Sequence, residues 1–358
     1  MRIVIVGAGV AGLGIGWRLL QAGCAVTVLD RAQPAGGASW AAAGMLAVSA
    51  ELEDAAEPEI ALALSANRMW PDFAAELEAA SGRSVAFARP GSLLLAHDGP
   101  ALEVLRARAG EGQQILDVDG IRLIAPMLNP MAGALWAPSE GQVDNRLLGE
   151  ALAVAFLKAG GRLIPNEAAV TIERRGGSAT AVLTPYARYG ADAFVIAAGA
   201  WSGLLDDIPI TPVKGEMIAL TPPDRAALPG PVIWGNGVYC VPRPHQGEQG
   251  RLLVGATVQE TGFDTSLTTA ARDHLRSRAQ ALMPLLKNWK LSDHWAGLRP
   301  KSPDGLPLLG PAKTGKLFVA GGQYRNGILF APAIAQMMAD LVLGKGVIVP
   351  AFDPRRFA

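Results

Sequence analysis

A glycine-rich turn near the start of the chain constrains the fold more than any other feature of the sequence. The run before it, Arg2–Val6, is short, apolar and rich in β-branched residues, which is typical of a buried strand. The turn itself, Gly7–Gly12 (GAGVAG), leads into a helical pattern that ends near Gly23. A second strand-like run, Ala25–Leu29, comes next. The segment therefore predicts a right-handed βαβ unit.

The three glycines of this turn match the requirements of a dinucleotide site. Gly7 permits the tight turn, Gly9 lets the backbone approach a pyrophosphate, and Gly12 lets the helix pack closely on the strand. Asp30 ends the second strand, where a carboxylate accepts hydrogen bonds from a ribose diol. Glycine-rich turns also occur for packing reasons alone, but strand, helix, second strand and acid in register favour a dinucleotide. NAD and FAD both remain open at this point.

The next segment, residues 36–46 (GGASWAAAGML), is small and uncharged. One interpretation is a tightly packed connecting helix. The other is that its small side chains let a second part of the cofactor lie along the backbone, with Ser39 able to bond a phosphate. A dinucleotide that extends inward from the first βαβ unit favours FAD, because a flavin ring is large and buried.

Further elements extend the same layer after an insertion. Asp144 is placed to cap a helix that ends at the glycine pair 160–161, and a strand follows at 162–165. Residues 168–174 and 178–184 have the pattern of a hairpin. A buried strand near 193–198 then runs into a glycine turn and a predicted helix.

The intervening segments differ in their pattern of predicted elements, with amphipathic helices over Ala61–Ala80 and Ala271–Leu286. Short strands are expected at 92–96, 217–220, 238–242 and 252–255. They predict an antiparallel sheet with helices on one face, which is a second layered domain. The expected division is 1–46, 144–210 and 296–358 for a discontinuous FAD-binding domain, and 47–143 and 211–295 for a substrate-binding domain.

Composition excludes several classes of protein. Half of the residues are hydrophobic and 18% are charged, which argues against intrinsic disorder. Lys plus Arg equals Asp plus Glu at 32 each, so no overall field favours nucleic acid or an anionic membrane. The two cysteines are too few for a disulfide framework or a cysteine-rich metal site. With no apolar run long enough to span a membrane, these features predict a soluble cytoplasmic protein without a metal.

Three motifs carry a resemblance to a known family. They are Ala41–Leu46 (AAAGML), Gly297–Pro300 (GLRP) and Tyr324–Leu329 (YRNGIL). Together with the N-terminal glycines they make the chain resemble the D-amino-acid oxidase superfamily of FAD flavoproteins, and most closely the bacterial glycine oxidases of thiamine biosynthesis. The resemblance runs from Arg2 to about Leu343. It implies a Rossmann-like α/β FAD-binding domain joined to an α+β substrate domain built on an antiparallel sheet.

The resemblance also implies a substrate pocket made by Tyr239, Arg299 and Arg325. Arg325 would clamp the substrate carboxylate, because a guanidinium forms a bidentate pair with a planar carboxylate. A tyrosine hydroxyl adds one further hydrogen bond. An isolated arginine is more often a solvated surface residue, so the expectation depends on all three residues occurring in family-like motifs. His245 and His294 lie near these motifs but have no metal-ligand spacing, and no catalytic role is expected for them.

A cofactor-binding set follows from the same resemblance. The backbone of Val170 would bind adenine, and the run that begins at Gly322 would approach the flavin pyrimidine edge, near the N-terminus of the last helix. No cysteine follows Cys240, so noncovalent FAD is expected. The full set is Gly7, Gly9, Val10, Ala11, Gly12, Asp30, Arg31, Ala38, Ser39, Ala42, Ala43, Gly44, Met45, Val170, Ala198, Gly199, Trp201, Arg299, Gly322, Arg325, Asn326, Gly327, Ile328 and Leu329.

The implied reaction is oxidation of a small amino acid or amine such as glycine, sarcosine or a small D-amino acid. Hydride passes from the α-carbon to flavin N5, dioxygen accepts the electrons to give hydrogen peroxide, and the imine hydrolyses to a 2-oxo acid and ammonia. Members of such families are often homo-oligomers, including tetramers. Asp30 is one methylene shorter than the glutamate usual at the ribose position, and Val258 stands where a bulkier pocket residue is common, which leaves the preferred amine open.

Three alternatives remain. The first is a flavin amino-acid dehydrogenase of the same fold, of proline or glycine type, that passes electrons to a quinone or a partner subunit. The second is a nicotinamide-dependent dehydrogenase, which would be colourless rather than yellow. The third is a non-enzymatic subunit that only holds FAD; such a subunit has no reason to combine Tyr239, Arg299 and Arg325.

Overall fold

The N-terminal βαβ unit forms the centre of a six-stranded sheet in the computed structural model, which describes residues 1–51, 55–224 and 228–357. β1 (Arg2–Val6) and β2 (Ala25–Leu29) are parallel neighbours connected by α1 (Val10–Gln21), as predicted. The strand order is β18-β19-β12-β1-β2-β8. The other four strands are β8 (Arg162–Ile164), β12 (Ala193–Ile196), β18 (Leu308–Pro311) and β19 (Leu317–Gly321).

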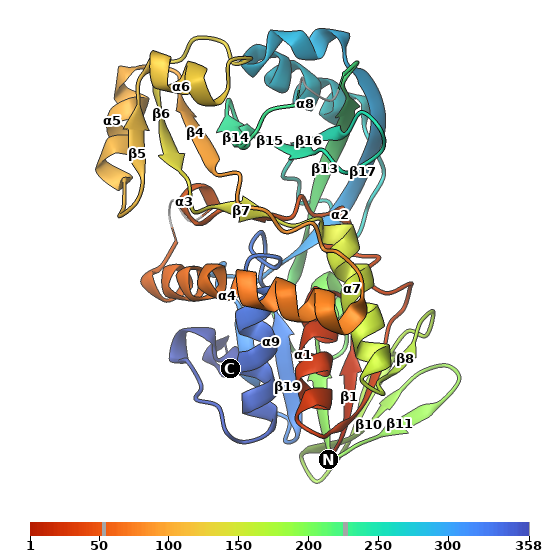
Figure 1. Ribbon diagram of the computed structural model, residues 1–358. Helices are drawn as coiled ribbons and strands as arrows, with labels where there is room; N and C mark the ends of the chain where they lie inside the picture. The colour runs from red at the N-terminus through yellow and green to blue at the C-terminus, as the bar shows by residue number, and fades with distance from the viewer. Residues whose placement is uncertain (52–54, 225–227, 358) are drawn as a thin grey trace.

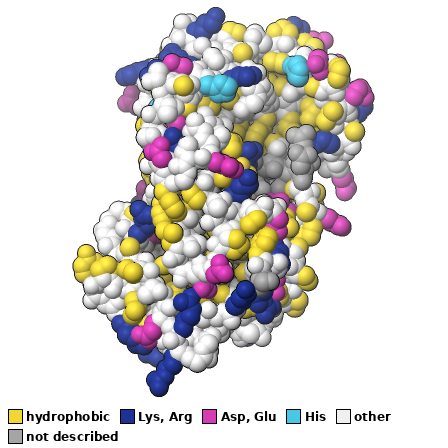
Figure 2. All heavy atoms as spheres, turned by 180° about the vertical axis from the view of Figure 1, so that it is seen from behind, with side chains coloured by type: hydrophobic (Ala, Val, Ile, Leu, Met, Phe, Trp, Pro, Cys, Tyr) yellow, Lys and Arg dark blue, Asp and Glu magenta, His cyan; other side chains and the backbone are white. Residues whose placement is uncertain are grey.

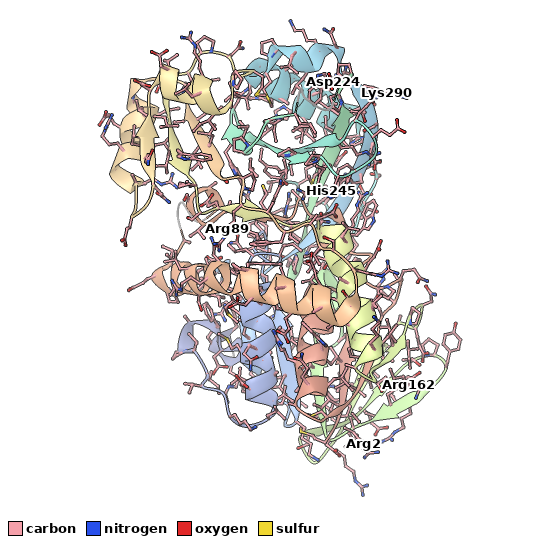
Figure 3. The ribbon with its side chains drawn as sticks, viewed as in Figure 1. Arg2, Arg89, Arg162, Asp224, His245 and Lys290 are labelled. Atoms are coloured by element: carbon pink, nitrogen blue, oxygen red, sulfur yellow. The ribbon has the colours of Figure 1, made fainter. Side chains whose placement is uncertain are left out.

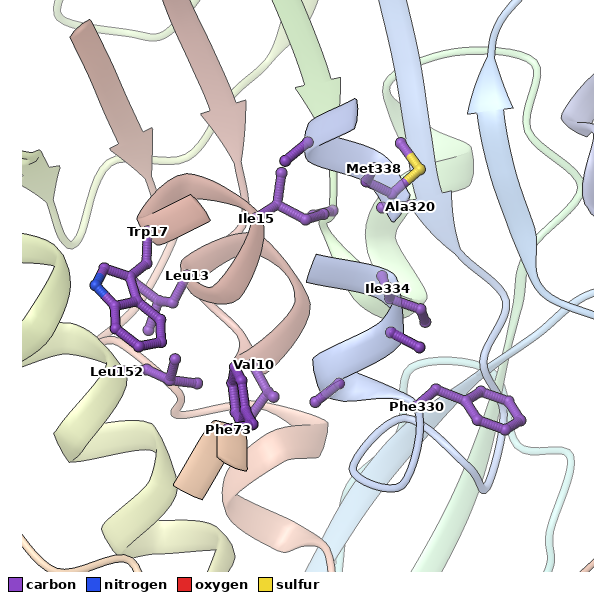
Figure 4. Packing of buried hydrophobic residues seen from close by; sticks show 14 of the residues in the cluster. Val10, Leu13, Ile15, Trp17, Phe73, Leu152, Ala320, Phe330, Ile334 and Met338 are labelled. Atoms are coloured by element: carbon purple, nitrogen blue, oxygen red, sulfur yellow. The ribbon is translucent and has the colours of Figure 1, made fainter. Parts of the chain in front are cut away.

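Helices cover one face of this sheet. They are α1, α4 (Glu57–Ser81), α7 (Asn145–Lys158) and α9 (Ala331–Val342), and the apolar side chains between them form one continuous core (Figure 4). Trp17 of α1 meets Phe73 of α4 edge to face at 5.9 Å between ring centroids. The sequence-based division assigns α4 to the second domain, whereas in the structure it packs against α7 and α9 of the first layer.

The other face carries a small three-stranded sheet made of β9 (Thr171–Arg175), β10 (Ser178–Leu183) and β11 (Arg188–Gly190). The hairpin expected over 168–184 is confirmed by the antiparallel pairing of β9 with β10. Ile172 and Val182 from this sheet pack against Val4 and Phe194 of the main sheet. The parallel strands are thus covered on both faces, as their nearly continuous apolar sequences require.

An eight-stranded sheet forms the other half of the molecule (Figure 1). Its order is β17-β13-β16-β15-β14-β4-β6-β5, and every neighbouring pair is antiparallel except β14 with β4. The strands are β4 (Ser92–Ala96), β5 (Gln114–Leu116), β6 (Gly133–Ala137), β13 (Thr211–Thr221), β14 (Val232–Gly235), β15 (Val238–Arg243), β16 (Arg251–Gly255) and β17 (Lys290–Lys301). The mainly antiparallel sheet is therefore confirmed.

Helix α8 (Thr269–Leu282) packs on this sheet, with α5 (Gly99–Arg108) and α6 (Val118–Ile124) near its far edge. The helix expected over Ala271–Leu286 is wrong at its C-terminal end. Pro284 begins a separate 3-10 turn, Pro284–Asn288, because a proline inside a helix has no N–H to donate and clashes with the preceding turn.

Several connections join the two halves. The long strands β13 and β17 pair along eleven positions, from Thr211 opposite Lys301 to Thr221 opposite Lys290. The expected boundary between residues 295 and 296 falls inside β17, so the domain limits stay a prediction. The two-residue strands β3 (Met45–Leu46) and β7 (Gly141–Gln142) also pair near the junction, beside the short helices α2 (Ala38–Ala41) and α3 (Val48–Glu51).

The surface carries charges of both signs. Figure 2 shows an upper and a lower mass joined at a narrower waist, with basic and acidic side chains interspersed over both. This distribution agrees with equal totals of 32 basic and 32 acidic residues. In the described ranges no helix combines the length and the apolar character needed to cross a bilayer.

Candidate active site

A cavity of about 1130 Å³ lies between the two sheets and is lined by residues of both. The glycine turn after β1, the end of β2 and the segment 36–45 form one side. Side chains from β13, β14, β15 and β17 form the other side. The volume exceeds the roughly 300–1,000 Å³ of ordinary small-molecule sites, which leaves room for a large cofactor together with a small substrate.

Two glycines of the turn, Gly7 and Gly12, are required by close contacts with backbone, and the third, Gly9, borders the cavity. Gly7 has a φ of +109°, and a Cβ there would lie 2.2 Å from the carbonyl oxygen of Ala197. A Cβ on Gly12 would lie 1.9 Å from the carbonyl oxygen of Gly7, so this glycine permits close helix packing and does not itself line the cavity. Gly9 borders the cavity, where a Cβ would meet only the Ser39 hydroxyl, at 3.2 Å. Gly9 therefore leaves open a space that a phosphate can occupy.

The Ser39 side chain reaches from α2 to the N-terminus of α1. Its hydroxyl accepts a hydrogen bond from the Val10 N–H at 3.0 Å. The carbonyl of Ser39 accepts from the Asn145 side chain at 2.8 Å, which ties the segment to the start of α7. A hydroxyl at this position is available to an anion that the helix N-terminus attracts. The segment contains only a four-residue helix, so the interpretation as one connecting helix is wrong.

Asp30 is held by backbone groups at the end of β2. It accepts hydrogen bonds from the N–H groups of Ala8 (2.6 Å) and Ala32 (2.8 Å), one on each carboxylate oxygen. Burial raises the pKa of Asp30, against the lowering effect of these two bonds. Each oxygen keeps a lone pair for a further donor such as a ribose hydroxyl.

Beside Asp30, an aromatic stack lines the cavity. The guanidinium of Arg31 lies 4.1 Å from the ring centroid of Trp201, which stacks on Phe263 at 5.6 Å. Two of these three residues, Arg31 and Trp201, belong to the predicted cofactor set. Phe263 was not predicted, because it comes from a loop far along the chain.

The loop between β19 and α9 supplies polar atoms that the rest of the described chain leaves unsatisfied. Gln323 and Asn326 both line the cavity and are buried. Gln323 Nε2 and Asn326 Oδ1 have no hydrogen-bond partner among the described residues. The other end of the Asn326 amide donates to Glu59 of α4 at 3.1 Å. One orphaned donor and one orphaned acceptor suit a ligand with a mixed polar edge, as a flavin has.

The three predicted substrate residues meet at the same cavity although they come from distant parts of the chain. Tyr239 lies on β15, Arg299 lies on β17 and Arg325 lies in the loop before α9. Tyr239 is half-buried, with its hydroxyl 3.6 Å from the sulfur of Met217. The Arg325 guanidinium lies 5.2 Å from the ring of Tyr324 and is exposed along the cavity.

Arg299 is the most closely held of the three. Its Nη1 donates to the carbonyl oxygens of Thr257 (3.1 Å) and Lys214 (3.4 Å). The guanidinium lies directly over Gly215, where a Cβ would approach Nη1 to 2.3 Å. A glycine at this position of β13 is therefore necessary for the arginine to reach the cavity.

Four predicted cofactor residues do not line the cavity: Gly12, Val170, Gly322 and Leu329. The Val170 N–H donates to the carbonyl of Leu183 at 2.8 Å and its side chain is 58% exposed, because it already belongs to the start of the hairpin. The residues that line the cavity there are Ala168 and Ala169. The binding of adenine by the Val170 backbone therefore stays a prediction.

The other two, Gly322 and Leu329, have structural surroundings. Gly322 has a φ of +72° and forms the turn after β19. Leu329 is buried in the helical core, and its carbonyl accepts from the indole N–H of Trp70 at 2.9 Å. Residues 323–328 of this run do line the cavity, and the approach to a flavin is expected from them.

Two further residues were not predicted from the sequence. Trp234 of β14 lines the cavity beside Tyr239, at 5.1 Å between ring centroids, and its buried indole nitrogen has no partner in the described ranges. Arg243 is completely buried and donates to the carbonyls of Ala43 and Val143. Burial lowers the pKa of Arg243 to about 10. The positions of Trp234 and Arg243 have no local sequence signal, since the contacts of each depend on strands and loops that are far apart in the sequence.

Asp144 does more than cap α7. Its carboxylate accepts from the Arg146 and Leu147 N–H groups, and its second oxygen lies 2.7 Å from His245 Nε2 and 2.7 Å from Gln246 Nε2. Figure 3 shows His245 between the two halves of the molecule. Burial alone would raise the pKa of Asp144, but these hydrogen bonds and the charge of Arg243 outweigh it and hold the pKa well below its ordinary value.

Because its pKa is depressed in the folded state, the Asp144 carboxylate contributes its full stabilisation above its ordinary pKa of 3.8. This contribution is lost as the pH falls from there towards the lower pKa of the folded state. Asp144→Asn keeps a capping oxygen and removes the charge. We expect the free energy of unfolding to fall by about 1–3 kcal/mol at neutral pH, with a smaller difference from wild type near pH 3. Urea unfolding over this pH range measures both. Asp117→Asn, at the exposed cap of α6, is the control; a difference independent of pH would contradict the assignment.

These features define a dinucleotide-dependent oxidoreductase. The parallel sheet with its glycine turn would hold the cofactor, and the second sheet supplies the substrate side of the shared cavity. Comparison with protein families is more specific. Residues 2–341 match the DAO family, described as FAD dependent oxidoreductase, and the chain belongs to this family. The fit of Gly9, Ser39, Asp30 and the orphaned Gln323 amide to a flavin dinucleotide agrees with the FAD dependence of the family.

Individual relatives cover nearly the whole chain. "Bifunctional protein ThiO/ThiG" of Synechocystis is 37% identical over 99% of this chain, but the chain spans only 54% of that relative. Glycine oxidase of Geobacillus kaustophilus is 34% identical, with 99% of this chain and 96% of the relative covered. Its crystal structure superposes with a TM-score of 0.92 at 32% identity and covers 98% of both chains. L-proline dehydrogenase of P. horikoshii shares the fold, with a TM-score of 0.87 at 22% identity and coverage of 99% of this chain and 97% of that one.

Proposed function

We propose that the protein is a FAD-dependent amino-acid oxidase that acts on glycine or another small amino acid. One observation carries the proposal: Tyr239, Arg299 and Arg325 line the same cavity as the dinucleotide-binding turn. The glycine oxidase relatives, which match this chain over nearly its full length, support the same reaction. FAD supplies the redox chemistry by accepting a hydride from the substrate.

The protein's own residues would bind and orient the amino acid. The guanidinium of Arg325 pairs with the carboxylate, and Arg299 and the Tyr239 hydroxyl contribute further donors. Trp234, Tyr239 and Met217 make this end of the cavity bulky and apolar. That wall favours substrates with little or no side chain, such as glycine, sarcosine and small D-amino acids.

No side-chain base is needed if the amine binds in its neutral form. The two histidines near the motifs are engaged elsewhere: His245 with Asp144 at 2.7 Å and His294 with Glu216 at 2.9 Å. Neither lines the cavity. The contribution of the protein is therefore to orient the α-carbon and to limit the access of water.

We propose dioxygen as the electron acceptor, which makes hydrogen peroxide the second product. A purified yellow protein that produces peroxide from glycine or sarcosine in air supports an oxidase. A protein that bleaches with substrate and passes electrons only to an artificial dye is instead a dehydrogenase. A yellow protein that neither bleaches nor forms peroxide with any small amino acid refutes the proposal, and a colourless one refutes the cofactor.

The binding mode of FAD and the oligomeric state complete the proposal. Neither Cys24 nor Cys240 lines the cavity, and burial raises the pKa of the Cys240 thiol to about 12, so we propose noncovalent FAD. Acid precipitation should release the flavin into the supernatant. We also propose a homo-oligomer, which light scattering on the FAD-loaded protein tests.

Tyr239→Phe should have a mild effect. The substitution removes one hydroxyl and keeps the ring that packs against Trp234. The loss of one hydrogen bond costs about 1 kcal/mol, so we expect kcat/KM for the best substrate to fall roughly fivefold with FAD binding unchanged. Steady-state peroxide assays measure the ratio, and Tyr186→Phe, at an exposed turn, is the control. A loss of a thousandfold would mean that the hydroxyl takes part in the chemical step.

A further inference from the structure

A buried pair of opposite charges lies behind the cavity wall. Lys214 and Glu216 alternate along β13 with Gly215 and Met217, which line the cavity, so the two charged side chains point to the opposite face of the sheet. Their side chains are 2% and 0% exposed, and Lys214 Nζ lies 3.2 Å from Glu216 Oε1. Removing two charges from water is costly, and a buried ion pair is weak evidence for a gain in stability. The pair therefore needs another explanation.

The beginning of segment 256–268, which connects β16 to α8, is bonded to the backbone beside this pair. The N–H of Glu216 donates to the Thr257 hydroxyl at 2.9 Å. The Lys214 N–H donates to the Gln259 carbonyl at 2.8 Å, and the Gln259 N–H donates back to the Lys214 carbonyl at 2.9 Å. The first residues of the segment thus form a short ladder with β13.

The end of the segment is bonded to the two charged side chains themselves. The N–H and the hydroxyl of Thr268 donate to the two carboxylate oxygens of Glu216, at 2.9 and 3.0 Å. Lys214 Nζ donates to the carbonyl of Ser266 at 2.5 Å. His294 Nε2 lies 2.9 Å from Glu216 Oε2, the oxygen that also accepts from the Thr268 N–H. A neutral residue at either position could not satisfy all of these groups.

The segment held in this way reaches the active site. Val258, Phe263 and Thr265 line the cavity, and Phe263 stacks on Trp201. The carbonyl of Thr257 accepts the hydrogen bond from the Arg299 guanidinium at 3.1 Å. A shift of the segment would therefore move both part of the cavity wall and the group that orients Arg299.

We propose that the Lys214–Glu216 pair is a positioning device that fixes segment 256–268 over the cavity and, through Thr257, orients the guanidinium of Arg299 for the substrate carboxylate. The orientation of substrate rests on the proposed function, whereas the anchoring of the segment does not. Lys214 and Glu216 act through Thr257 and the segment and do not touch the substrate. A purely structural role as an elaborate cap for α8 is the competing explanation, since Thr268 is also the N-cap of that helix.

The test uses the FAD-loaded protein and two variants. Glu216→Gln removes the negative charge and leaves Lys214 buried without it, so this variant risks misfolding. The double variant Lys214→Met with Glu216→Gln removes both charges and leaves none uncompensated. Glu260→Gln is the matched control, because Glu260 lies in the same segment but its side chain is 75% exposed.

Two readouts separate positioning from simple capping. Hydrogen exchange of the peptide spanning 256–268 should become at least tenfold faster in the double variant, while peptides from β1 and α1 exchange as in wild type. The dissociation constant of acetate, a carboxylate that cannot be oxidised, should rise at least tenfold when measured by the change in flavin absorbance. Glu260→Gln should resemble wild type in both.

Unchanged exchange in segment 256–268 overturns the anchoring. Faster exchange with unchanged acetate binding overturns the link to Arg299 and leaves only the cap. Hydrogen exchange needs no turnover, so it decides the anchoring even if wild-type protein oxidises no amino acid. That last result would refute the proposed function separately.

Discussion

Arg325→Ala should lower kcat/KM for the best amino-acid substrate by roughly 30-fold to several thousandfold, mainly through a higher KM, while FAD stays bound. Truncating one partner of a desolvated charge pair costs on the order of 2–5 kcal/mol, and tenfold in affinity corresponds to about 1.4 kcal/mol. Arg325 lines the cavity and its side chain is exposed. An exposed ion pair contributes no more than about 1 kcal/mol, so the size of the effect reports whether the bound substrate removes the guanidinium from water.

The controls for Arg325 separate the charge from the geometry. Arg325→Lys keeps the charge but loses the planar fork that grips both carboxylate oxygens, and it should recover only part of the activity. Arg162→Ala removes an exposed arginine on β8, outside the cavity (Figure 3), and should leave kcat/KM unchanged. Steady-state kinetics with the flavin content of each variant measured in parallel make the comparison. Wild-type kinetics in Arg325→Ala would refute the clamp.

Local sequence signals were sufficient for the first layer and much of the second. The βαβ unit is encoded by a β-branched run, a glycine turn and a helical period within thirty residues, and it forms with the predicted bounds for both strands. The strand predicted at 92–96 also has the predicted bounds. In these elements the period of apolar residues and the glycine stops agree with the packing that follows.

The structure adds to the expectations where tertiary packing decides, and it corrects them at the end of one helix. Helix α4 has the amphipathic pattern of a surface helix, and nothing in that pattern says which layer it covers; the structure packs Trp70 and Phe73 into the first. The role expected for Val170 depends on a resemblance of motifs, which carries no information on the hydrogen bond from its N–H to Leu183. The end of α8 could have been read from Pro284, which stops the helix.

The site was predicted only as far as motifs reach. Arg299 and Arg325 stand in recognisable motifs and do line the cavity. Trp234 and the Lys214–Glu216 pair carry no local signal, because their roles depend on which residues face each other across β13, β14 and β17. Their neighbours are set by strand register between segments that are far apart in the sequence, as in the pairing of Thr211 with Lys301. The register between such distant strands cannot be predicted from the local pattern of residues in a single sequence.

Gly9→Val should strongly weaken FAD binding without unfolding the protein. Gly9 has φ −74° and ψ 179°, an extended conformation that valine adopts freely. A Cβ there meets only the Ser39 hydroxyl, at 3.2 Å, so a small shift of that one side chain accommodates the substitution. The larger valine would fill the space beside the α1 N-terminus in which the pyrophosphate is expected. Overpacking costs about 1–3 kcal/mol, which corresponds to a loss of roughly 5- to 150-fold in FAD affinity.

Two other glycine substitutions show that the effect is specific to the cofactor. Gly7→Ala places a Cβ 2.2 Å from the Ala197 carbonyl oxygen at a φ of +109°, so it should destabilise the apoprotein itself. Gly110→Val, in the loop after α5 of the other layer, meets only the Gln113 side chain, at 3.8 Å, and should change neither property. The measurement is the thermal midpoint with and without added FAD, since a ligand that binds only the native state raises it. Gly9→Val should melt like wild-type apoprotein and gain much less from FAD than wild type does; a wild-type gain would exclude the pyrophosphate from this turn.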